Sequence, residues 1–355
     1  MSVSGGSGYA HRTMSDKPLI LLDPHPRSKD LIFDAPTIAR LENLGRVIWH
    51  DGREPAAAAH IDRWLPEATV LIGQSPLPAE RLARAPLLKF VANVESNFLP
   101  NVDYQECFRR GIQVVATGPV FAKPVAEMAL GLALACARRI PQADAALRAG
   151  NETLYGEGDN HDSILLSGKP LALIGCGNLG RALLPLLRPF GGEILIHDPW
   201  IHPTVIREMG ATPSTLDECF RRGAVVFILA ATTSENVGGI DKRHFSVMRQ
   251  SGIVVLISRA GVVNFPDLLE AADSGRIRAA IDVWPTEPIP ATEPGRTIRN
   301  TVIQAHRAGN IPEIWPEMGR MVVDDLELVL RGLPPQRCQR AVPEVVNRLR
   351  SKPVT

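Results

Sequence analysis

The chain has 355 residues, of which 45% are hydrophobic and 22% are charged, and its formal net charge is +1. This length exceeds what one ordinary core holds and predicts two domains. The near-neutral charge gives no electrostatic reason to expect nucleic acid or an anionic membrane surface as a partner, so we expect a small molecule or another protein chain.

The N-terminal region and the cysteines favour a soluble protein of the cytoplasm. Residues 1–16 are small and polar and predict a flexible tail without an apolar signal core. No uninterrupted apolar run approaches the roughly 18 residues of a membrane span. The cysteines are odd in number and scattered, with no C-x-x-C pair, which favours reduced structural thiols over disulfides or a metal site. They are Cys107, Cys136, Cys176, Cys219 and Cys338.

From residue 17 onward, short apolar runs alternate with amphipathic segments. We expect a helix at about 35–44 and strands at 18–23, 46–49, 68–73, 88–93 and 111–116. This β-α repeat predicts a parallel sheet with helices on both faces.

A long helix rich in alanine and leucine is expected at 125–139. It is apolar nearly all round, so we expect it to be buried between domains or at a subunit interface. The second alternative predicts a symmetric homodimer.

After a loop at about 150–168, the sequence reads as strand, glycine turn, helix, strand and acid. The apolar run 171–174 leads into Gly175, Gly177 and Gly180, with Asn178 and Leu179 between the last two. The first glycine permits a tight turn, the second lets backbone approach a pyrophosphate, and the third lets helix and strand pack closely.

Asp198 ends the next apolar run, 18 residues past Gly180 and near the spacing of roughly 20 for a carboxylate that binds ribose hydroxyls. The pattern therefore predicts a dinucleotide site, and NAD over NADP. Pro185 should kink or shorten the helix after the turn.

A second β-α series follows, with strands expected at 224–229, 252–258, 277–283 and 301–304 and a last helix at 313–330. Three polar residues, Arg259, Glu287 and His306, stand at or just beyond strand ends, where open α/β sheets place their ligands. Taken singly, Arg259 reads more readily as a surface arginine, Glu287 as a solvated loop carboxylate and His306 as a structural histidine. Together they suggest a carboxylate-binding fork and an acid/base pair.

From Leu88 to about Gly309 the chain resembles the D-isomer-specific 2-hydroxyacid dehydrogenases. The matching pieces are the start of the long helix at 125–127, the glycine turn with Asp198, and the segments 258–261, 280–288 and 306–309. The resemblance implies an α/β fold of two Rossmann-like or flavodoxin-like parallel-sheet domains with a cleft between them. The substrate domain would comprise 17–118 and 310–355, including a returning C-terminal helix, and the NAD-binding domain 119–309.

The resemblance also implies roles for single residues. Arg259 would orient the carboxylate of a 2-keto or 2-hydroxy acid, and His306 would be the general acid/base. Glu287 would hold the imidazole and keep it protonated, since a carboxylate stabilises imidazolium. Asp282 would bind the nicotinamide carboxamide, although a capping aspartate explains it as well. The implied cofactor is NAD, and the implied assembly is a homodimer through the NAD-binding domain.

The chain departs from the family in the expected substrate loop at 93–103. This segment has no glycine and carries Glu95, Ser96 and Asn97, which we take as candidate substrate-binding residues. Glu95 would repel a substrate carboxylate unless it points away or pairs with a cation. Arg307 either adds a second anion contact, favouring a dianionic substrate, or faces solvent.

Two other functions remain open. An NAD(H)-binding regulatory protein of this fold with little turnover is favoured by the altered loop and opposed by the intact set of Arg259, Glu287 and His306. A related oxidoreductase for formate or phosphite is opposed by Glu287, because the formate branch resembles this site with a glutamine there.

Overall fold

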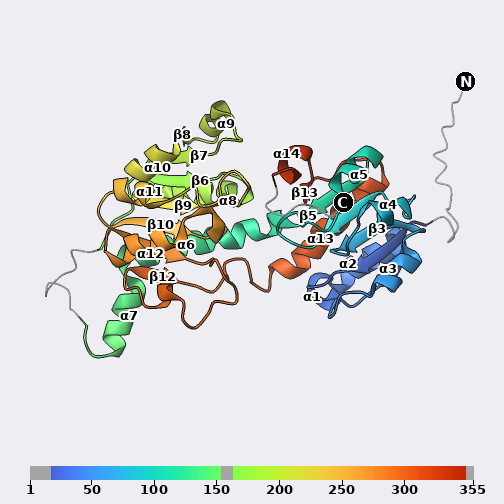
Figure 1. Ribbon diagram of the computed structural model, residues 1–355, viewed down its shortest axis with the longest axis horizontal. Coiled ribbons are helices and arrows are strands. Elements are labelled where there is room, and N and C mark those ends of the chain that lie inside the picture. The colour runs from blue at the N-terminus through green and yellow to red at the C-terminus, as the bar shows by residue number, and fades with distance from the viewer. Residues whose placement is uncertain (1–16, 153–162, 349–355) are drawn as a thin grey trace, which may run out of the picture. The chain divides into compact units, whose positions relative to one another are not determined.

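A computed structural model describes residues 17–152 and 163–348 of the chain, which fall into two compact units (Figure 1). Within those limits, unit 1 contains residues 17–118 and 315–347, and unit 2 contains 119–314 and residue 348. The last long helix lies in unit 1 apart from its first residue, and the chain returns to unit 1 at Trp315. The expected flexible tail at 1–16 lies outside the described residues, as does 153–162 of the expected loop.

Unit 1 is built on a six-stranded sheet in the order β13-β5-β4-β3-β1-β2. All neighbouring strands are parallel except β13 and β5. The order 2-1-3-4-5 of its five parallel strands is flavodoxin-like. The strands are β1 (Leu19–Asp23), β2 (Arg46–Trp49), β3 (Ala68–Gly73), β4 (Phe90–Asn93), β5 (Gln113–Ala116) and β13 (Gln339–Arg340).

The helices of unit 1 follow the expected β-α alternation. Helix α2 begins after Asp34, whose side chain accepts a hydrogen bond from Thr37 N–H at 3.0 Å and caps the helix. The helices are α1 (Lys29–Ile32), α2 (Ala35–Leu44), α3 (Ala58–Trp64), α4 (Ala79–Ala83), α5 (Tyr104–Arg110), α13 (Ile314–Leu330, with its first residue in unit 2) and α14 (Pro343–Val346).

The short antiparallel strand β13 was not expected from the sequence. It is positioned by Asp325 of α13, a buried carboxylate that accepts three backbone N–H bonds of 2.7–2.9 Å, from Gln336, Arg337 and Cys338. These bonds fold the chain after α13 back to the sheet, where Gln339 and Arg340 pair with β5.

Unit 2 is built on a seven-stranded parallel sheet in the order β12-β11-β10-β9-β6-β7-β8. The first strand, β6, lies in the interior, and the chain winds outward from it in both directions, as in a Rossmann fold. The strands are β6 (Leu171–Ile174), β7 (Ile194–His197), β8 (Thr212–Pro213), β9 (Val225–Ile228), β10 (Gly252–Leu256), β11 (Ile277–Ile281) and β12 (Thr301–Ile303).

Helices cover both faces of this sheet, as predicted for a parallel sheet. Alternate residues of β6 face opposite sides: Leu171 and Leu173 pack in one apolar cluster with α6 and α8, and Ala172 and Ile174 in a second with α10, α11 and α12. The α-helices are α6 (Ala122–Arg138), α7 (Ile140–Arg148), α8 (Asn178–Leu187), α9 (Pro203–Glu208), α10 (Leu216–Arg222), α11 (Lys242–Val247) and α12 (Phe265–Asp273). Short 3₁₀ helices are η2 (Gly118–Phe121), η3 (Arg188–Phe190), η4 (Ala260–Val262) and η5 (Pro294–Arg296).

Helix α6 corrects the expectation of a helix buried all round. One face packs on α8, β10, β11 and β12, whereas Lys123, Glu127 and Gly131 are exposed.

By length and composition alone, the segment Gly118–Arg138 would suffice to cross a membrane. Its most apolar window of 18 residues has a mean hydropathy of 1.6, and half of that window is buried. Buried core helices of soluble proteins meet the same criterion.

Candidate functional site

The glycine turn lies between β6 and α8, and its geometry explains two of the three glycines. Gly175 has φ +91°, and a Cβ there would lie 2.8 Å from backbone atoms of Ala230. A Cβ on Gly180 would lie 2.7 Å from the carbonyl oxygen of Gly175. A tight turn and a close helix approach therefore require these glycines, as the sequence predicted.

Gly177 has a different environment. It is the residue before α8, its φ is −73°, and a Cβ added to it would meet no atom within 4 Å. No steric demand of the protein itself thus explains a glycine here. An open space at the N-terminus of a helix of ten residues, beginning at Asn178 and Leu179, is what an approaching pyrophosphate needs.

Asp198 follows β7 and is tied to the glycine turn. One carboxylate oxygen accepts a hydrogen bond from Cys176 N–H at 2.8 Å, and the other accepts one from Trp200 N–H at 2.9 Å. Each carboxylate oxygen has a second lone pair for a ligand hydroxyl. The pair of loops thus holds an acid beside the turn, where a ribose diol would bind.

The turn also marks the point where the chain winding reverses. Strand β6 lies between β7 and β9, and the residue that limits Gly175 is Ala230, two residues past the end of β9. Ligands of open α/β sheets bind at this reversal, outside the carboxyl ends of the strands. The residues of the turn therefore fit a dinucleotide.

Asp282 follows β11 and is fully buried. Its carboxylate accepts hydrogen bonds from Arg307 N–H at 2.9 Å and Ala308 N–H at 3.3 Å. Burial raises the pKa of this carboxyl, and the two backbone bonds act in the opposite direction. In this structure Asp282 fixes the turn after β12, the capping role that the sequence left open beside a carboxamide contact.

Glu287 and His306 are in close polar contact at this edge. His306 Nδ1 lies 2.6 Å from Glu287 Oε2, and Trp284 N–H donates to Glu287 Oε1 at 3.0 Å. His306 has φ +52°, unusual for a residue with a side chain, and its N–H donates to Asp282 O at 2.7 Å. The imidazole is therefore held in one orientation, with Nε2 outside the pair.

Arg259 stands at the same carboxyl edge, three residues beyond β10. Its Nη1 donates to Ser258 O at 2.7 Å, and Ser258 is itself anchored by its hydroxyl to Ala230 O at 2.8 Å. Strands β10, β11 and β12 are neighbours in the sheet, so the segments carrying Arg259, Glu287 and His306 leave the sheet at one edge. Arg307 is exposed beside them.

The candidate loop residues lie in unit 1, beyond the carboxyl end of β4. Glu95 forms an ion pair with Arg27 at 2.8 Å, and Glu95 O accepts a hydrogen bond from Thr117 N–H at 3.0 Å. Ser96 is half-buried and Asn97 is exposed. Glu95 was expected to repel a substrate carboxylate unless it points away or pairs with a cation. The structure shows the pairing with a cation, Arg27.

Sequence reasoning missed two residues that hold these groups. Trp284 acts through its backbone N–H, which no side-chain pattern reveals. Arg27 stands in the loop after β1. The rule that ligands bind at the carboxyl ends of strands points to this loop, but it does not predict that Arg27 pairs with Glu95.

The chain matches the family model for the NAD-binding domain of D-isomer-specific 2-hydroxyacid dehydrogenases over residues 130–308. It is 31% identical to D-3-phosphoglycerate dehydrogenase of Mycobacterium tuberculosis over 316 residues, which cover 88% of this chain and 56% of the relative. The chain thus spans about half the length of that curated relative. It is 29% identical to glyoxylate reductase of Korarchaeum cryptofilum over 84% of this chain and 90% of that protein.

Among solved structures, a phosphoglycerate oxidoreductase from Rhizobium etli resembles the chain with a TM-score of 0.83 and 42% identity. The match covers 93% of this chain and all of that one. These matches support the fold expected from the sequence, and they support NAD(H) as the cofactor of unit 2.

Proposed function

Because the chain belongs to the D-isomer-specific 2-hydroxyacid dehydrogenase family, we propose that it is an NAD(H)-dependent oxidoreductase that interconverts a D-2-hydroxy acid and a 2-keto acid. The observation that carries this proposal is the 2.6 Å contact between His306 and Glu287 at the carboxyl edge of the unit 2 sheet. A histidine oriented by a carboxylate is what proton delivery to a carbonyl oxygen requires.

Each residue of this set has a proposed task. His306 gives a proton to the carbonyl oxygen in reduction and accepts it back in oxidation, through the ring nitrogen outside the Glu287 pair. Glu287 is a positioning residue that fixes the ring and stabilises its protonated form. Arg259 binds the substrate carboxylate. The bound nicotinamide supplies or accepts the hydride.

For the cofactor, we propose that the N-terminus of α8 and Gly177 receive the pyrophosphate and that Asp198 binds the adenosine ribose. Asp198 already takes one N–H on each oxygen, so a diol would complete its bonding. The Asp282 carboxylate already accepts hydrogen bonds from the 307–308 backbone. It would accept a hydrogen bond from the nicotinamide carboxamide through its remaining lone pairs.

The charges near the loop at 95–97, rather than its shape, indicate which substrates are possible. Arg27 neutralises Glu95, so the loop at 95–97 does not exclude an anionic substrate, and we propose that Ser96 and Asn97 contact it. The curated relatives carry the names of D-3-phosphoglycerate dehydrogenase and glyoxylate reductase. We propose a substrate of this 2-hydroxy or 2-keto acid class, with unit 1 as the substrate domain and unit 2 as the NAD domain.

The direct test follows NADH absorbance with glyoxylate, other 2-keto acids and, in the oxidative direction, D-3-phosphoglycerate. Turnover of at least one acid by the native chain and its loss in His306→Ala are expected. If NADH binds and no acid is turned over, the proposal fails and the regulatory alternative is favoured. If His306→Ala retains full turnover, the assigned acid/base is wrong.

We further propose a homodimer formed through unit 2. Helix α7 has no buried residue, and its Ile140 and Leu147, 55% and 63% exposed, lie two turns apart on one side of the helix. Exposed apolar side chains on such a helix are typical of an interface. A single monomeric species in sedimentation at micromolar concentration contradicts the dimer.

A cytoplasmic location is also proposed. All five cysteines are free and buried, which fits a reducing compartment.

A further inference from the structure

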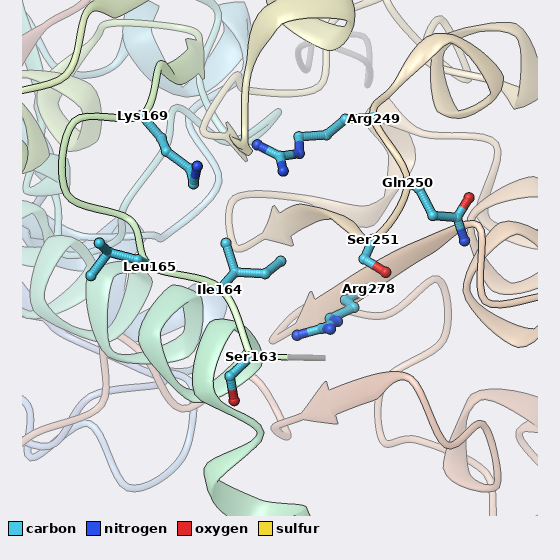
Figure 2. Close-up of a pocket in the computed structure, with 8 residues that line it drawn as sticks. All are labelled: Ser163, Ile164, Leu165, Lys169, Arg249, Gln250, Ser251 and Arg278. Atoms are coloured by element: carbon cyan, nitrogen blue, oxygen red, sulfur yellow. The ribbon is translucent and has the colours of Figure 1, made fainter. Parts of the chain in front are cut away.

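Unit 2 has a pocket of about 360 Å³ at the amino ends of β6, β10 and β11 (Figure 2). Lys169 stands two residues before β6, Ser251 one residue before β10, and Arg278 is the second residue of β11. Because these strands are parallel, the pocket lies at the edge of the sheet opposite to the glycine turn and His306. It is therefore separate from the proposed catalytic and nucleotide sites.

The pocket is cationic. Lys169, Arg249 and Arg278 line it, and its other lining residues are uncharged. In Figure 2 the side chains of Lys169 and Arg249 extend toward one another. Neither forms an ion pair with a residue in the described part of the chain, whereas Arg81, Arg222 and Arg243 each pair with a carboxylate. Like charges brought together repel, so the arrangement favours an anion between them.

Two of the lining groups are held rigidly. Arg278 is only 5% exposed, and its Nη1 donates to the carbonyl oxygens of Cys136 and Ala137 at 3.0 and 3.4 Å, at the C-terminus of α6. Its charge is little screened by water because it is buried. Ser251 has φ +59°, and its N–H donates to Arg276 O at 3.1 Å. The Arg278 charge and the backbone at Ser251 are thus fixed before any ligand binds.

We propose that this pocket binds a small, multiply charged anion that carries a phosphate group. Lys169 and Arg249 would bind the phosphate oxygens, as cationic side chains commonly do. The Ser251 hydroxyl would donate a further hydrogen bond. The volume lies near the lower end of small-molecule pockets, roughly 300–1,000 Å³, and fits a phosphorylated metabolite rather than a nucleotide cofactor. This site goes beyond the proposed oxidoreductase function and does not depend on it.

The test is calorimetric titration of the full chain with inorganic pyrophosphate, in the presence of saturating NADH so that the nucleotide site is filled. Citrate and chloride at equal ionic strength are the comparison anions. The variants are Lys169→Gln and Arg249→Gln, with Arg221→Gln as the matched control, since Arg221 is exposed at the end of α10 and does not line the pocket.

We expect one pyrophosphate per chain in the native protein and in Arg221→Gln, and about tenfold weaker binding in each pocket variant, as loss of one charge-assisted contact predicts. NADH binding should be unchanged in all variants. Binding no tighter than that of chloride, or pyrophosphate binding that Lys169→Gln and Arg249→Gln leave intact, overturns the site. Citrate binding equal to that of pyrophosphate overturns the assignment to phosphate.

Discussion

His306 and Glu287 are 19 residues apart in the sequence, yet His306 Nδ1 and Glu287 Oε2 lie 2.6 Å apart. The contact arises because β11 and β12 are parallel neighbours, so the loops that follow them leave the same edge of the sheet. Trp284 N–H binds the second oxygen of Glu287. The carboxylate is therefore fixed from two directions, and it fixes the imidazole in turn.

This relationship predicts a graded effect of two substitutions on turnover. His306→Ala should lower kcat by about 10²- to 10⁴-fold, the usual contribution of a general acid/base. Glu287→Gln should lower it by about tenfold, because an amide oxygen still accepts the Nδ1–H bond but carries no charge to stabilise imidazolium. Steady-state kinetics measure both, with NADH binding as the control. A Glu287→Gln loss as large as that of His306→Ala contradicts the division of roles.

The glycine turn predicts a contrast between two alanine substitutions. Gly175→Ala places a Cβ against the Ala230 backbone at φ +91°, and should lower the free energy of unfolding by about 1–3 kcal/mol as well as weaken NADH binding. Gly177→Ala meets no protein atom within 4 Å. It should keep the stability and weaken only NADH binding. Thermal unfolding with calorimetry separates the two effects, and equal destabilisation by both variants argues against this reading of the turn.

Asp198 predicts the cofactor preference. A 2′-phosphate placed against this carboxylate would be repelled and would lose the bonds of a ribose hydroxyl. NADH should therefore bind at least about tenfold more tightly than NADPH, and Asp198→Asn should narrow the difference. Titration of each cofactor measures it. The prediction does not survive tighter binding of NADPH to the native chain.

Asp34 predicts a pH-dependent contribution to stability. Hydrogen bonds from Thr37, then Arg320, lower the pKa of Asp34 from 3.8 to about 2. A lowered carboxyl pKa stabilises the folded state above pH 3.8, and this contribution is lost as the pH falls toward 2. At pH 7 Asp34→Ala should lower the free energy of unfolding by about 1 kcal/mol through loss of the α2 cap, and Asp34→Asn by less. Denaturant titrations at pH 7 and pH 3 test this; a deficit of Asp34→Asn that grows toward pH 3 has the wrong sign.

Arg307 predicts a substrate effect that can be read from rate ratios. Its backbone N–H is bound by Asp282, whereas its side chain is exposed. Arg307→Ala should therefore change kcat/KM for monoanionic and dianionic keto acids by the same factor. A selective loss with dianionic acids would instead make Arg307 a second anion contact.

Most of the fold could be predicted from local patterns in the sequence. Buried parallel strands are continuous apolar runs, so β6, β9 and β10 were found within a residue or two of their ends. The two-residue strands β8 and β13 have no such run, and β13 depends on Asp325, a carboxylate 14 residues before it. Helix α8 continues through Pro185 to Leu187 and then narrows to a 3₁₀ turn.

The candidate site was predictable to the extent that it is local. The glycine turn is contained in six residues, so spacing alone located it. The pairing of Glu95 with Arg27 joins loops after two different strands, and no periodicity signals it. Arg278 lies in a strand whose other four residues are apolar, where a charge appears as an irregularity until its bond to the end of α6 is seen.

The Asp325 contacts have a consequence for solubility. The hydrogen bonds that Asp325 accepts from the 336–338 backbone bring β13 alongside the outer edge of β5. Without β13, this edge would present unpaired N–H and C=O groups. Such an open edge is a template for pairing with other chains. Strand β13 thus protects the β5 edge from pairing with other chains, and we expect a protein shortened to Leu333 to self-associate through β5.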